Sequence, residues 1–300
     1  MSVPAAYLGV IIVWATTPLA IQWSGESVGF LFGATSRMAL GAGLSLLLVL
    51  AFRAPMPWHR RAVQAYASAA IGVFGAMLTA YWAAQHVPSG LISVLFGLTP
   101  LIAGVLAALW LNERNLTAIK ITGILLGIAG LAVIFRADLS DYPTAWKGIT
   151  ALLVAASLHS VSMVLVKRHG ESIPALAQST GGLLLALPCY LLLWLLVDGG
   201  AWPEHIPLRS GLAILYLGGF GSVLGFLLYF HVLKRLTTGS VALITLITPV
   251  LALLLGRFVN QEQVPASVWA GSGLVLAGLA LHQWGHRLGR QRYKSVAEKG

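Results

Sequence analysis

The chain has 300 residues, of which 58% are hydrophobic and only 9% are charged. A soluble globular protein has about 25% charged residues, so this composition excludes a water-soluble fold. The formal net charge is +10, but the basic residues lie in short loops and a C-terminal stretch and form no single patch, which argues against a nucleic-acid partner. Cys189 is the only cysteine, which excludes an intrachain disulfide and a cysteine metal cluster.

Ten apolar stretches follow one another along the chain, and a helix of about 20 such residues spans a bilayer. They cover residues 4–22, 28–52, 66–85, 89–111, 117–135, 147–166, 173–197, 210–233, 239–258 and 266–285. The polar segments between them are too short for a soluble domain, and no basic region precedes the first stretch as in a cleavable signal peptide. The predicted fold class is an all-α integral membrane protein with ten transmembrane helices.

The distribution of Lys and Arg predicts the orientation of these helices. With the N-terminus in the cytoplasm, 14 of these residues fall on the cytoplasmic side and 4 on the outer side, while Arg37 lies inside a helix. Cytoplasmic loops are enriched in basic residues, so both termini are predicted to be cytoplasmic. Nine or eleven helices would put the basic C-terminal stretch on the wrong side.

One membrane segment occurs twice. Residues 89–113, SGLISVLFGLTPLIAGVLAALWLNE, align without a gap with residues 238–262, TGSVALITLITPVLALLLGRFVNQE. The alignment matches Gly90 with Gly239, Thr99 with Thr248, Pro100 with Pro249, and Glu113 with Glu262. An internal repeat in an apolar chain is typical of a transporter built from two structural halves.

Each half contains five predicted helices, an odd number. The second half must therefore start on the opposite side of the membrane and lie inverted relative to the first. We predict a first five-helix repeat over residues 4–136, an inverted second repeat over 147–285, and a basic cytoplasmic tail over 286–300. Such a pair suits alternating access to a site near the membrane midplane.

These features together resemble the drug/metabolite transporter superfamily, with two EamA-type domains. The resemblance rests on VWATTP around Trp14, on SRMALGAG with Arg37, and on the duplicated Thr-Pro segment with its following GILLGIAGLAVIF and GSGLVLAGLAL stretches. It implies a bacterial inner-membrane, multi-pass exporter of amino acids and related metabolites. The family has no invariant catalytic signature, so the resemblance does not identify the substrate.

Arg37 is the strongest candidate for substrate binding, because it lies about ten residues into the second predicted helix. A charge at that depth costs roughly 2.5–3.5 kcal/mol or more unless it faces a partner or water. It either faces the cavity and attracts a substrate carboxylate, or bonds backbone carbonyls and ties helix ends together. The single charge also makes a phosphorylated substrate, which would want several cations, the weaker alternative.

Four other side chains are candidates for the cavity wall. Trp14, Tyr81 and Trp82 offer aromatic faces to an apolar or cationic group, although Trp and Tyr are also common at membrane interfaces. Trp14 is the deepest of the three. His159 is the most deeply placed histidine and either binds substrate, carries a proton, or simply bonds a neighbouring helix.

The two Thr-Pro pairs are candidate hinges. Pro100 and Pro249 each remove a helical hydrogen bond, and Thr99 and Thr248 can satisfy a freed carbonyl. A fixed kink is the alternative.

The carboxylates that end the two repeats, Glu113 and Glu262, are candidate gate or anchoring residues, or else mark helix boundaries. The small-residue motifs Gly123-x-x-x-Gly127 and Gly273-x-x-x-Ala277 predict close packing, within one monomer rather than across a dimer.

The sequence therefore predicts a secondary transporter with a small-molecule substrate, the lipid bilayer as its surroundings and no cofactor. No phosphate loop, zinc-ligand spacing or nucleophile motif is present, so an enzyme is not expected. The alternatives are uptake or exchange of a sugar-linked or phosphorylated metabolite, an intramembrane enzyme acting on a lipid-linked substrate, and a structural anchor. The last of these leaves the inverted duplication unexplained.

Overall fold

A computed structural model of the chain describes residues 2–111, 117–137, 142–169, 173–233, 235–236 and 238–297. Every regular element within those ranges is a helix. Length and composition make seven helical stretches of the described chain long and apolar enough to cross a membrane, and two shorter stretches, Leu208–Leu224 and Leu243–Val259, are apolar as well. An all-α membrane fold is therefore confirmed. The predicted gate residue Glu113 lies outside the described residues.

The helices of the described chain group into ten segments, one for each predicted apolar stretch. The first five segments are α1 (Val3–Gly25), α2 (Phe30–Ala51), α3 with η1 and α4 (Arg60–Ala70, Ile71–Ala76 and Met77–Ala83), α5 with α6 (Ser89–Phe96 and Thr99–Trp110), and α7 (Ala118–Phe135). The second five are α8 (Ala145–His169), α9 (Ala175–Val197), α10 with η2 and α11 (Leu208–Tyr216, Leu217–Leu224 and Gly225–Leu233), α12 (Thr238–Val259), and α13 (Ala266–Ala297).

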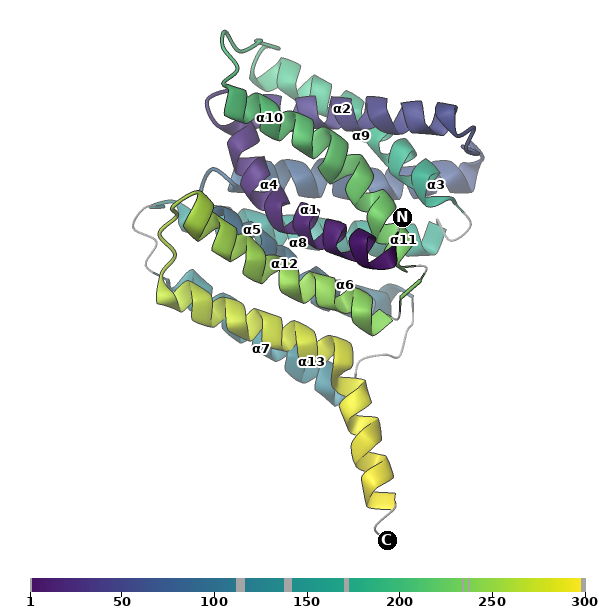
Figure 1. Cartoon of the computed structure of the whole chain (residues 1–300), viewed down its shortest axis with the longest axis vertical. Coiled ribbons are helices and arrows are strands. Elements are labelled where there is room, and N and C mark those ends of the chain that lie inside the picture. The colour runs from purple at the N-terminus through teal and green to yellow at the C-terminus, as the bar shows by residue number, and fades with distance from the viewer. Residues whose placement is uncertain are drawn as a thin grey trace.

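The largest differences from the predicted helix boundaries are at the start of α3 and at the end of α13. The helix predicted to start at residue 66 starts at Arg60, because the His59 ring accepts a hydrogen bond from the backbone N–H of Ala62 (3.3 Å) and caps the polar first turn. The last helix continues to Ala297, so most of the predicted tail over 286–300 is helical, and Figure 1 shows it projecting from the bundle. Hydropathy marks where a helix enters the membrane and not where its hydrogen bonding begins or ends.

The third and the eighth segments each contain a π-helical stretch in their middle. These stretches are η1, with the sequence IGVFGA, and η2, with the sequence LGGFGSVL. A π-helix is rare and often marks a functional site, because its wider turn leaves backbone groups free for other partners. The two occupy equivalent places in the two halves.

Helices in equivalent places of the two halves pack against each other. Figure 1 shows α2, α9 and α10 along one side of the bundle, α1, α5, α8 and α12 through its middle, and α7 beside α13 at the other side. The direct pairs are α2 with α9, α5 with α12, and α7 with α13. A further pair of contacts is matched too, since η1 packs on α8 as η2 packs on α1. This pattern is the one expected for two five-helix units related by a two-fold axis.

The paired helices run in opposite directions. Gly123 of α7 lies against Gly278 of α13, and Gly130 of α7 lies against Gly271 of α13, so residue numbers rise along one helix as they fall along the other. Only glycine allows the two backbones to approach this closely. This is the antiparallel geometry that inverted halves require, while the boundaries of the halves and the side of the membrane on which each terminus lies stay predictions.

One predicted packing motif contacts the other half and one does not. Gly123 and Gly127 are buried within the chain, as the sequence predicted. Gly273 and Ala277 are exposed, and a Cβ added to Gly273 would meet no atom within 4 Å, so the expected face of α13 is wrong. Gly271 and Gly278 take its place, because the spacing of seven residues between them follows two helical turns along the α7 contact.

We expect Gly278→Ala to destabilise the protein by about 2–3 kcal/mol, because the added Cβ would overlap the backbone carbonyl of Gly123, which no rotamer change can move. Gly273→Ala on the same helix is the matched control, and it should be neutral or stabilising by up to about 1 kcal/mol from helix propensity. Thermal unfolding in detergent measures both. Equal shifts for the two variants would contradict the α7–α13 crossing.

Candidate functional site

Arg37 of α2 lies buried in the middle of the helix bundle, with only 5% of its surface exposed. Its Nε donates a hydrogen bond of 3.2 Å to Oγ of Ser222, which belongs to the π-helical segment η2. Its guanidinium carbon lies 5.9 Å from the centre of the Tyr81 ring on α4, which is also buried. The predicted residues Arg37 and Tyr81 are thus brought together from two helices, and Ser222 joins them from the opposite half.

The guanidinium of Arg37 uses only part of its hydrogen-bonding capacity. Its buried Nη1 has no hydrogen-bond partner among the described residues, and no carboxylate there pairs with it. A buried charge without a partner is costly, and a planar guanidinium binds a carboxylate through two parallel hydrogen bonds. The guanidinium therefore keeps free hydrogen-bonding capacity at Nη1 that a single anionic group could use.

Tyr190 of α9 braces the other π-helical segment. Its hydroxyl donates to the carbonyl oxygens of Val73 (2.8 Å) and Phe74 (3.4 Å) in η1, and its ring meets the Phe74 ring edge-on at 5.1 Å. The wider turn of η1 frees these carbonyls, and the buried tyrosine satisfies them. Sequence reasoning missed both Tyr190 and Ser222. The glycine content of η1 and η2 is a local signal that could have indicated these segments.

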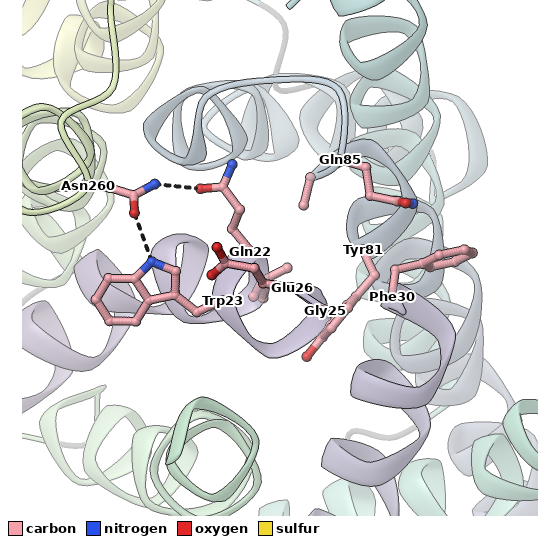
Figure 2. A pocket seen from close by; sticks show the side chains of 10 residues that line it. Gln22, Trp23, Gly25, Glu26, Phe30, Tyr81, Gln85 and Asn260 are labelled. Atoms are coloured by element: carbon pink, nitrogen blue, oxygen red, sulfur yellow. Dashed lines mark hydrogen bonds between the residues drawn. The ribbon is translucent and has the colours of Figure 1, made fainter. Parts of the chain in front are cut away.

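A cavity of about 280 Å³ opens between the end of α1, the start of α2, the end of α4 and the residues after α12. Its walls combine aromatic and polar side chains and are formed by Ile21, Gln22, Trp23, Gly25, Glu26, Phe30, Tyr81, Ala84, Gln85 and Asn260. Figure 2 shows Asn260 between Trp23 and Gln22, with Tyr81 and Phe30 on the facing wall. Tyr81 lines this cavity and also neighbours Arg37, so it connects the cavity to the buried cation.

Glu262 anchors two helix ends beside this cavity. It is 8% exposed, and its Oε2 accepts the backbone N–H of Ser89 at the start of α5 (3.0 Å). Its Oε1 accepts from Nδ2 of Asn260 (2.8 Å). A carboxylate at a helix N-terminus satisfies a free N–H and interacts favourably with the helix dipole. This geometry matches the anchoring alternative for Glu262.

The other three predicted wall residues contact different parts of the bundle. Trp14 is half-buried against an apolar cluster built by α1, α11 and α12. Trp82 is 36% exposed and tilts over the His86 ring at 4.5 Å. His159 of α8 packs edge-on against Phe96 at 5.9 Å, and its Nδ1 has no hydrogen-bond partner in the part of the chain described.

His86, next to Trp82, lies in the connection between α4 and α5. Its Nδ1 is 2.8 Å from Oγ1 of Thr144. Burial, and then the positive charge of Lys147, lower the pKa of His86. It is therefore a neutral hydrogen-bonding partner at pH 7.

The two Thr-Pro pairs adopt different structures. In the first copy, α5 ends at Phe96 and α6 begins at Thr99, with Pro100 in its first turn. In the second copy, α12 runs without interruption through Thr248 and Pro249. Oγ of Ser160 donates to the carbonyl oxygen of Thr99 (3.1 Å) at the break, which fixes it against α8. The hinge role of all four residues stays a prediction.

The sequence matches the family described as "EamA-like transporter family" over residues 3–136 and again over 146–282. The chain belongs to the EamA-like transporter family. It is accordingly a multi-pass membrane transporter of a small-molecule substrate and not an enzyme. The resemblance to EamA-type proteins that the sequence indicated is confirmed.

Two relatives of this EamA-like transporter have names that describe export of amino acids or their metabolites. It is 29% identical to "Probable terminal-alkyne amino-acid exporter" of Streptantibioticus cattleyicolor, over 95% of this chain and 97% of that protein. It is 27% identical to "Probable amino-acid metabolite efflux pump" of Salmonella typhimurium, over 68% and 70%. A solved crystal structure shares the fold with a TM-score of 0.65 at 21% identity, over 96% of this chain and 99% of the other.

Proposed function

We propose that this EamA-like transporter exports amino acids or related small metabolites across a bacterial inner membrane, and that Arg37 holds the carboxylate of the substrate. The observation that carries the proposal is the guanidinium of Arg37, which is buried within the helix bundle with an Nη1 that has no partner among the described residues. A charge in this position marks a functional site by default, and a carboxylate is its natural partner. The names of the two relatives support the same substrate class.

The charge of the site favours a carboxylate over a phosphorylated substrate. Among the Lys and Arg residues whose side chains are described, only Arg37 is buried. A phosphate group carries about two negative charges, so its binding calls for several cations, whereas one guanidinium matches one carboxylate.

Alternating access requires two arrangements of similar free energy, and the matched packing of α2 with α9, α5 with α12, and α7 with α13 supports this mechanism. With both termini in the cytoplasm, as the loop charges predict, the cavity bounded by α1, α2 and α4 opens toward the outer side. The close contacts between α7 and α13 are made within one chain, which supports a monomer as the working unit.

The purified protein in liposomes loaded with a mixture of labelled amino acids and sugar phosphates tests this proposal. We expect saturable efflux of one or a few amino acids and no efflux of sugar phosphates, with protein-free liposomes as the control. Efflux of sugar phosphates alone would instead support the alternative function, transport of a phosphorylated metabolite. A correctly folded protein that moves neither class would overturn the proposal.

A further inference from the structure

Arg209, in the first turn of α10, places its guanidinium beside the cavity. Its Nη2 donates to Oδ1 of Asn260 (2.6 Å), and its Nη1 lies 3.5 Å from Oε2 of Glu26. Its guanidinium carbon sits 4.2 Å from the centre of the Trp23 ring. One cation from the second half of the chain therefore contacts a carbonyl oxygen, a carboxylate and an aromatic face together.

These three partners all line the cavity, although Arg209 does not. Figure 2 shows Trp23 and Asn260 joined by a hydrogen bond, with Glu26 between them and the facing wall. A carboxylate, an aromatic ring and an amide oxygen are the groups that proteins use to bind an organic ammonium ion. Phe30 and Tyr81 on the facing wall would suit the apolar body of such a ligand.

Asn260 is held in the orientation that this chemistry needs. Its Nδ2 donates to Oε1 of Gln22 (3.1 Å) and to Oε1 of Glu262 (2.8 Å). Both amide protons are thereby used, and Oδ1 is turned to accept from Nε1 of Trp23 (2.9 Å) and from Arg209. The acceptor stays in place whether or not Arg209 does, because its orientation is set by Gln22 and Glu262.

Arg209 is held much less firmly than Asn260. The side chains of Arg209 and Glu26 are 47% and 52% exposed. An ion pair this open to solvent contributes little, because water screens the charges and both side chains lose freedom in forming it. A ligand that brings its own ammonium group can therefore replace the guanidinium without leaving a buried charge unpaired.

We propose that Trp23, Glu26 and Asn260 form a binding site for the amino group of the transported substrate, and that Arg209 is a tethered competitor for this site. The identity of the ligand as an amino acid rests on the function proposed above. The competitor lowers the affinity of the site on the outer side: when the substrate leaves through the cavity, Arg209 takes its place and hinders rebinding. A tethered group competes at a high effective concentration.

Thiol protection tests the ammonium site without any transport. Cys189→Ser removes the only cysteine, and Gln85→Cys places a reporter in the cavity wall. The probe is butylammonium, with butyrate as its anionic counterpart, and labelling uses the uncharged reagent N-ethylmaleimide. In the Arg209→Gln background, butylammonium should protect the thiol at about tenfold lower concentration than with Arg209 present, the factor expected for one weak ion pair plus one exposed cation–π contact.

Further variants make this test specific. Adding Glu26→Gln or Trp23→Leu to Arg209→Gln should abolish the stronger protection by butylammonium. Arg257 is an exposed cation at the end of α12, and Arg257→Gln should leave protection at the level of the parent. Equal protection by butyrate and butylammonium, or equal protection with and without Arg209, would overturn the proposal. Thermal unfolding of each variant shows that the fold is retained.

Transport tests the role of Arg209 as a competitor. In liposomes that export an amino acid, the same amino acid added outside should inhibit efflux at about tenfold lower concentration for Arg209→Gln than for the parent. Amino-acid efflux with unchanged outside inhibition would overturn the proposal for Arg209 and leave the proposed function standing. Selective butylammonium protection in a protein that exports no amino acid would support the ammonium site and remove the amino acid as its ligand.

Discussion

Replacing Arg37 with methionine should reduce amino-acid efflux by roughly 100-fold or more, because a carboxylate would lose a buried, charge-assisted pair of hydrogen bonds. Arg37→Lys keeps the positive charge but loses the planar fork, so its efflux should fall by about tenfold. The fold should survive Arg37→Met, because the guanidinium donates to Ser222 alone among its described partners and its removal takes a charge out of the bundle. Initial rates in proteoliposomes and thermal unfolding measure the two effects separately.

Two further variants test this prediction, one that disturbs the position of the guanidinium and one that serves as a control. Ser222→Ala removes the hydroxyl that positions the guanidinium and should weaken the apparent affinity for substrate more than the maximal rate. Arg257→Gln removes an exposed cation and should change neither quantity. Wild-type transport by Arg37→Lys would exclude recognition of a carboxylate through two hydrogen bonds. Loss of transport together with a large drop in thermal stability would instead assign Arg37 a structural role.

Glu262→Ala should destabilise the protein by about 2–4 kcal/mol, because the Ser89 backbone N–H and the Asn260 amide would both lose a buried acceptor. Glu262→Gln keeps one acceptor oxygen but turns an NH2 group toward the other donor, so it loses the charge at the start of α5 and one of the two hydrogen bonds, at a cost of about 1–2 kcal/mol. Glu204→Gln, an exposed carboxylate in the connection before α10, should be neutral. Thermal unfolding in detergent measures all three.

The same variants separate the two readings of Glu262. An anchoring residue changes stability first, and transport by Glu262→Gln should stay within about fivefold of the parent once the protein is folded, since Gln keeps one of the two hydrogen bonds that Glu262 accepts. A gate residue would change the transport rate and leave the unfolding temperature unaltered. That second outcome would contradict the anchoring role that the contacts with Ser89 and Asn260 support.

Hydropathy located all ten helical segments of the described chain, most of them to within a few residues, because the thickness of a bilayer sets a length that can be read from one sequence. It failed at the start of α3, where a histidine cap and not apolarity begins the helix. The Thr-Pro repeat predicted equivalent segments, yet one copy is broken at residues 97–98 and the other is continuous. The two copies differ in sequence at the break, where Gly97 aligns with Leu246, and they differ in packing, with α8 bonding the break in the first copy.

The sequence predicted the candidate site only at the position where a single residue has a high free-energy cost in an apolar helix. Arg37 could be identified from the sequence because a charged side chain inside an apolar helix costs free energy whichever way it points. Tyr81 was named as one aromatic among several, and nothing local distinguished it from Trp82, which lies exposed one residue further on. Asn260 and Glu262 lie at a helix end where polar residues are ordinary, so their shared network with Trp23 and Gln22 had no local signal.

The sequence by itself determined the membrane class, the number and order of the helices, and the duplication that relates the two halves. Those properties depend on composition, on runs of apolar residues and on matching segments, all of which are local or directly comparable. Only the tertiary structure decided that Arg37 meets Ser222, 185 residues away, and that Asn260 meets Trp23, 237 residues away. A membrane helix is apolar on nearly every face, so its pattern does not reveal which face turns inward, and packing against its neighbours makes that choice.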